Sequence, residues 1–141
     1  MNLEKILSIP GKKGLYKLVS QGKNNVVVES LLDGSRMPVF SSTRASALDN
    51  ICIFTDNEDL LLKEVFKRIF QKENGKKSID VSIAKPTEIE ACMAEIVPEY
   101  DPLKVHVSDM KKLFSWYNQL LEKNMLSFEE EEEEEEKEEN N

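Results

Sequence analysis

The sequence predicts an α+β fold, in which a small antiparallel β-barrel-like domain with a covering helix precedes a small helical domain and an acidic tail. Two observations predict it. Three apolar runs separated by turn signals fill residues 14–40, and the apolar period becomes helical from residue 62 onwards. We place the β domain at residues 1–75, a polar linker at 76–85, the helical domain at 86–126 and the tail at 127–141.

Three strands are expected in the β domain, at residues 15–20, 26–32 and 35–40. Residues 22–25 and the pair Asp33 and Gly34 separate them, because Gly and Asn tolerate the positive φ of short hairpin loops. Apolar residues of the first strand fall on both of its faces, which predicts a closed or nearly closed barrel. Pro38 cannot donate a ladder hydrogen bond, which predicts that the third strand lies at an edge or carries a bulge there.

Shorter elements flank this meander. Leu3, Ile6 and Leu7 have helical spacing and predict one short helical turn near the N-terminus. Residues 51–55 and 60–61 are expected to form two brief strands, because both are apolar and an acidic turn separates them. The β domain would then contain four or five strands.

Two amphipathic helices follow. The first begins near Leu62, covers an open end of the sheet and ends at residues 74–75, where Asn-Gly is a typical C-terminal signal. The second opens with Thr87, for which Glu90 completes a capping box, and Pro98 stops it.

The longest helix is expected from Ser108, as its N-cap, to about Lys123, with Asn124 as a terminator. Its apolar residues cover more than half of the helix circumference, which is more surface than one short partner helix can bury. They are Met110, Leu113, Phe114, Trp116, Tyr117, Leu120 and Leu121. The rest of this surface docks either on the β domain or on a second protein chain.

Charge is concentrated at the C-terminus. The formal net charge is −8, and residues 129–141 carry ten glutamates against Lys137; removing this −9 leaves +1 for residues 1–128. A run of like charges has nothing to bury, so we expect the tail to be disordered. It acts as a solubilising appendage, competes with nucleic acid for the basic loops, or recruits a basic partner.

The remaining composition indicates a soluble, cytoplasmic protein. Cys52 and Cys92 lie far apart in apolar contexts, as in reduced intracellular proteins. No apolar run approaches the roughly 20 residues that a membrane span needs, and the N-terminus does not resemble a signal peptide. We therefore expect no membrane partner.

No motif predicts catalysis. His106 is the single histidine and has no Cys or carboxylate cluster beside it, so we expect a surface or capping role and no metal site. Gly11 and Gly14 lack the spacing of a phosphate loop. We expect no catalytic residues and no cofactor.

Two groups of residues are candidates for binding. Trp116 and Tyr117 are candidate partner contacts on the long helix. Six cations are candidate nucleic-acid contacts, although a solvated basic surface is their simpler interpretation: Lys12, Lys13, Lys17, Lys23, Arg36 and Arg44.

Four separated segments also resemble one family. GKKGLYKLVSQGKN, VVVESLLDGSRMPVF, LKEVFKRI and VHVSDMKKLFSWYNQLLEK are similar, in order, to an uncharacterised family of short Bacteroidetes proteins that consist of two adjoining domains of unknown function. The resemblance covers most of residues 1–126 and omits the tail. It implies a small N-terminal domain similar to an SH3-like barrel and a helical C-terminal domain, and it brings no established activity, ligand or catalytic residue.

These observations together predict a non-catalytic cytoplasmic binding or adaptor protein. Its partner would be an unknown protein, or a second copy of the chain, that contacts the aromatic C-terminal helix. The alternative is a weak nucleic-acid-binding module that uses the lysine-rich loops of the β domain.

Overall fold

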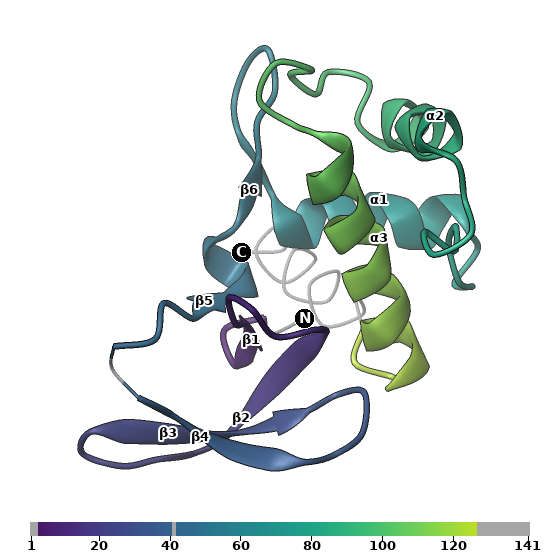
Figure 1. Cartoon of the computed structure of the whole chain (residues 1–141). Coiled ribbons are helices and arrows are strands. Elements are labelled where there is room, and N and C mark those ends of the chain that lie inside the picture. Colours follow the sequence, from purple (N-terminus) through teal and green to yellow (C-terminus); the bar gives the residue numbers. More distant parts are fainter. Residues whose placement is uncertain (1–2, 41, 127–141) are drawn as a thin grey trace, which may run out of the picture.

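In the computed structural model, which describes residues 3–40 and 42–126, an antiparallel sheet and three helices form one mixed α+β structure (Figure 1). The predicted fold class is confirmed, and the predicted disorder of the tail falls outside the described residues. The elements are β1 (Ile6–Ser8), β2 (Leu15–Gln21), β3 (Asn25–Ser30), β4 (Arg36–Phe40), β5 (Ser46–Ala47), the 3₁₀ helix η1 (Leu48–Asn50), β6 (Cys52–Ile53), β7 (Leu60–Leu61), α1 (Leu62–Lys72), α2 (Pro86–Ile96) and α3 (Val107–Glu122).

The main sheet is open and not a closed barrel. Its five strands run in the order β4-β3-β2-β1-β5, and each neighbouring pair is antiparallel. The barrel prediction rested on apolar residues on both faces of β2, which the sheet explains differently. Leu15 and Tyr16 point to opposite faces of β2, and each face is covered by its own hydrophobic cluster. Pro38 lies on β4, which is an edge strand as predicted.

The N-terminal segment differs from the predicted helical turn. A turn is present, since the Ile6 amide donates to the Leu3 carbonyl at 3.2 Å, but the chain then continues as strand β1. This strand pairs with β2 on one side and with β5 on the other. Two flanking strands offer its backbone groups more partners than an isolated helical turn can.

The helix ends agree with the sequence better than the helix starts. Asn74 and Asn124 adopt positive φ values of 55° and 54°, and each reverses the chain just after α1 or α3. In contrast, α2 begins at Pro86 without the predicted Thr87 cap. Helix α3 begins after His106, whose backbone amide donates to the Asp109 carboxylate at 3.0 Å, and not at Ser108.

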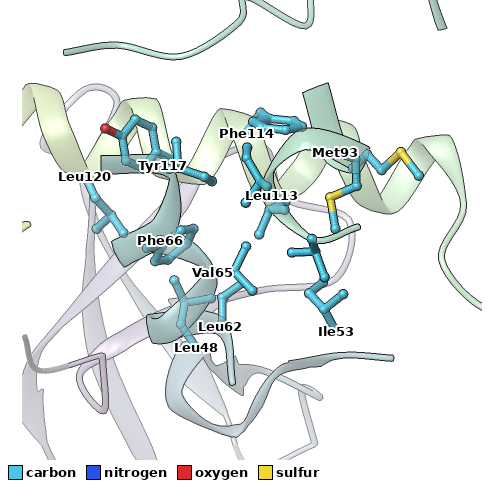
Figure 2. Close-up of a cluster of buried hydrophobic side chains, with 14 of the residues drawn as sticks. Leu48, Ile53, Leu62, Val65, Phe66, Met93, Leu113, Phe114, Tyr117 and Leu120 are labelled. Carbon is cyan, nitrogen blue, oxygen red and sulfur yellow. The ribbon is translucent and has the colours of Figure 1, made fainter. Parts of the chain in front are cut away.

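One large hydrophobic cluster joins the sheet to all three helices (Figure 2). Half of its buried members come from residues 1–75 and half from residues 86–126. The rings of Phe66 on α1 and Tyr117 on α3 meet at its centre, with centroids 6.3 Å apart. Residues 76–85 also contact α3, because the Ser78 amide donates to Asn118 at 2.8 Å. The division into two domains stays a prediction, and the core extends across the proposed boundary.

Within the described residues, no helix is both long enough and apolar enough to cross a membrane.

Candidate functional site

Helix α3 presents its outer face to two adjoining hollows, and Trp116 lines both of them. We call the larger one, of about 370 Å³, the lysine hollow; it lies between residues 8–14 and α3. The smaller one, of about 160 Å³, we call the apolar hollow; it lies between β6 and α3. Trp116 is half-buried, so one side of its ring packs on the core and the other remains accessible.

The loop that forms one wall of the lysine hollow is held against α3. The backbone amide of Leu15 donates to the Gln119 side-chain oxygen at 2.9 Å, which joins the start of β2 to the helix. Gly14 has a φ of +81°, and a Cβ there would lie 2.6 Å from Leu32 Cδ1 and 3.1 Å from Gln119 Oε1. Only glycine combines this conformation with so close an approach. The position of this loop against α3 is therefore fixed by specific contacts.

Four lysines surround the lysine hollow. Lys12 and Lys13 come from the loop, and Lys111 and Lys112 come from the first half of α3. All four are exposed, and within residues 3–40 and 42–126 none of them forms an ion pair. Among the described residues that line this hollow there is no carboxylate. Four uncompensated cations in one concave surface attract anions, an attraction that weakens as salt is added.

The sequence analysis identified two of the four lysines, Lys12 and Lys13, together with Trp116. It missed Lys111 and Lys112. A signal was available, because Lys112 precedes Trp116 by four residues and therefore shares its helix face. What the sequence lacked was the proximity of the loop to α3.

The apolar hollow offers a different environment on the other side of Trp116. Side chains of Ile51, Ile53, Leu62, Val105 and Leu113 line it. Its volume is close to the roughly 150 Å³ of an apolar cavity that accepts benzene. At its rim the Lys104 ammonium lies 5.3 Å from the centre of the Phe54 ring, a cation–π distance.

The other predicted site residues lie elsewhere. Tyr117 is completely buried, and its hydroxyl donates to the Lys76 carbonyl at 2.9 Å. This corrects its assignment as a partner contact, because helix geometry turns position 117 towards the core while position 116 lies at the edge of the apolar stripe. Phe114 and Leu113, on the same face of α3, are buried as well.

The remaining cations do not join the lysine hollow. Lys17 and Arg36 flank Glu29 on the sheet; Lys17 is its partner in the β2–β3 register, and Arg36 forms an ion pair with it at 3.2 Å. Lys23 lies in the β2–β3 turn, at the other end of β2 from Lys13, which is roughly 20 Å away at the rise of a strand. Arg44 is exposed between β4 and β5. The six predicted cations therefore form no single surface.

Two comparisons identify relatives of the chain. The family model "Domain of unknown function (DUF5606)" matches residues 3–48, and "Domain of unknown function (DUF6852)" matches residues 51–120. A solution NMR structure from Bacteroides vulgatus, a target of the Northeast Structural Genomics Consortium, is similar over 90% of this chain and 91% of its own, with 42% identity and a TM-score of 0.74.

The chain belongs to this two-domain family. The family resemblance noted in the sequence is thereby confirmed. The two family models meet at residues 48–51, ahead of the linker predicted at 76–85, so α1 falls with the second model and not with the sheet. None of the curated proteins matches the chain.

Proposed function

We propose that the protein is a non-catalytic binding protein that takes an extended acidic segment of a partner protein into the lysine hollow. The observation that carries the proposal is the placement of Trp116 among Lys12, Lys13, Lys111 and Lys112 with no carboxylate between them. Lysine ammonium groups pair with carboxylates, and a half-buried tryptophan is a typical anchor of protein interfaces.

The apolar hollow refines the class of ligand. It adjoins the lysine hollow through Trp116 and Lys112, and its volume suits one apolar side chain. An acidic segment that carries a single Phe or Leu next to its carboxylates satisfies both hollows. A single-stranded nucleic acid fits less well, because only one aromatic faces the hollow and the other candidate cations lie on different surfaces.

The lining of the lysine hollow supports a binding role over a catalytic one. Among the described residues its side-chain donors come from lysines, serines, Trp116 and Gln119, and none of the lining residues is a histidine or a carboxylate that could act as a general base. We place the protein in the cytoplasm, since both Cys52 and Cys92 are free thiols.

A labelled peptide of one phenylalanine followed by eight glutamates provides the test. Fluorescence anisotropy at about 20 mM salt should report binding of this peptide to the chain with its native lysines. Changing all four lysines of the hollow to glutamine should weaken binding roughly tenfold, because exposed ion pairs contribute roughly 0.2–1 kcal/mol each. The matched control removes the same charge from exposed positions outside the hollow: Lys17→Gln, Lys23→Gln, Lys63→Gln and Lys85→Gln.

Each outcome has one meaning. Equal loss of binding in both quadruple variants would reduce the effect to net charge and overturn the proposed site. Binding of a ten-nucleotide oligothymidine, but not of the peptide, would replace the acidic segment with single-stranded nucleic acid. Trp116→Ala should weaken peptide binding, and because one side of the ring packs on the core it should also lower the thermal midpoint by a few degrees.

A further inference from the structure

We infer that the chain carries its own competitor for this site: the glutamate run at residues 129–136 occupies the lysine hollow until an acidic partner displaces it. The inference rests on the proposed function, because the glutamate run and the acidic partner compete for the same hollow. It follows from where the chain leaves α3, how far the run reaches and how the charges are distributed.

The exit of the chain from α3 directs it back towards the molecule. Asn124 adopts the left-handed conformation, with a φ of 54°, and the Met125 amide then donates to the Leu120 carbonyl at 2.9 Å. This hydrogen-bond pattern reverses the chain direction at a helix end. Met125 and Leu126 consequently pack against the main core instead of continuing along the helix axis.

The glutamate run is long enough to reach the lysines. Lys111 lies 15 residues before Leu126, which corresponds to about 22 Å at the rise of an α-helix. Residues 127–136 span up to about 33 Å when extended. A returning segment therefore reaches Lys111 and Lys112 with several residues to spare.

A third hollow, of about 300 Å³, lies between the lysine hollow and the end of α3. It shares Lys13, Ser115 and Gln119 with the lysine hollow and extends to Glu122. Its charges are mixed, since Lys77 pairs with Glu122 at 4.0 Å and Asp80 also lines it. The third hollow therefore attracts a glutamate run less than the lysine hollow does.

The charges of the glutamate run and of the lysine hollow are complementary. Eight consecutive glutamates follow Phe128, and four lysines without ion pairs among the described residues surround the lysine hollow. Tethering converts a weak interaction into an intramolecular one, with an effective concentration on the order of millimolar. A partner that also fills the apolar hollow would displace the run.

Trp116 is the single tryptophan of the chain, so its fluorescence reports directly on the hollow. The key variant replaces residues 129–136 with an alternating Gly-Ser segment of equal length, which removes the charge and keeps the chain length. In the full chain at about 20 mM salt we expect acrylamide to quench Trp116 about half as strongly as in this variant. Raising the salt to about 1 M should remove the difference, because screening releases the run.

The lysines provide the matched test. Changing Lys12, Lys13, Lys111 and Lys112 to glutamine should raise quenching to the level of the tail variant, and combining both changes should add nothing further. The control quadruple at positions 17, 23, 63 and 85 should quench like the native chain. Equal quenching of the native chain and the tail variant at low salt would overturn the inference.

The phenylalanine-octaglutamate peptide separates the two proposals. If both hold, the tail variant binds the peptide about tenfold more tightly than the native chain, and the two affinities converge in high salt. Strong and equal binding by both chains would remove the competitor but leave the proposed function intact. Binding by neither chain would remove the function itself.

Discussion

The inner part of the sheet (β1 and the start of β2) and its outer part (β3, β4 and the end of β2) differ in the hydrophobic clusters that they contribute to. The start of β2 and strand β1 contribute Leu15 and Ile6 to the large cluster that all three helices share. The outer part, formed by β3, β4 and the end of β2, packs mainly in a second, smaller cluster on the opposite face of the sheet. Its buried members are Val28 and Val39 from β3 and β4, together with Tyr16 from the start of β2 and Ile9 after β1. Figure 1 shows β3 and β4 at the opposite end of the molecule from α2.

The two parts of the sheet therefore contribute differently to stability and to binding. The outer strands leave large apolar side chains in solvent, with Phe40 56% and Val19 37% exposed, so they depend more on backbone pairing than on burial. The inner part of the sheet packs against all three helices through the large cluster. The lysine hollow lies at this better-packed end, where Gln119 holds the loop between β1 and β2, and a rigid frame favours precise binding.

The strongest test of the comparison is to divide the chain at the predicted domain boundary. Residues 1–75 would lose the half of the main cluster that α2 and α3 supply, including Phe114 and Tyr117. We therefore expect this fragment to give a poorly dispersed amide spectrum, while the full chain gives a dispersed one. A dispersed spectrum and cooperative unfolding of the fragment would instead establish residues 1–75 as a domain and show that the outer cluster suffices.

Core truncations compare the two clusters directly. Phe114 is fully buried in the main cluster, and Phe114→Ala should lower the free energy of unfolding by roughly 3–5 kcal/mol. Val28 is equally buried in the outer cluster, and Val28→Ala should cost about 1–2 kcal/mol, because two methyl groups are removed. Urea unfolding measures both values. Similar costs at the two positions would contradict the uneven distribution of stability.

A further expected effect concerns the pH dependence of stability. Burial, with a further contribution from the Glu73 carboxylate, raises the pKa of Tyr117 to about 12 from an ordinary value of 10.0. Between pH 10 and 12 the unfolded chain therefore releases this proton while the folded chain retains it, so stability falls as pH rises. Over this window the loss amounts to roughly 2 kcal/mol.

Tyr117→Phe removes the titrating group and should flatten this part of the pH dependence. It also removes the hydrogen bond to the Lys76 carbonyl, which should cost about 1 kcal/mol at every pH. The informative quantity is thus the slope of the unfolding free energy against pH, measured from pH 8 to 11.5. An unchanged slope in Tyr117→Phe would mean that the phenol contributes nothing to alkaline unfolding.

Local signals in the sequence determined much of the fold. Apolar runs and turn residues located β2, β3 and β4, and Pro38, which has no amide proton to donate, was compatible with the edge position of β4. The helical stripes identified α1, α2 and α3, and the left-handed Asn74 and Asn124 marked two of their ends. These features depend on residues within a few positions of one another, so a sequence pattern can carry them.

Only the tertiary structure decided which surfaces meet. Whether apolar residues on both faces of β2 line a barrel or two clusters depends on what covers each face, and this information lies outside the strand. The site is a similar case. Lys12 and Lys111 are separated by about a hundred residues, and they face one hollow because the Leu15 amide bonds to Gln119. Periodicity specifies the face of an element, whereas long-range packing selects the partner of that face.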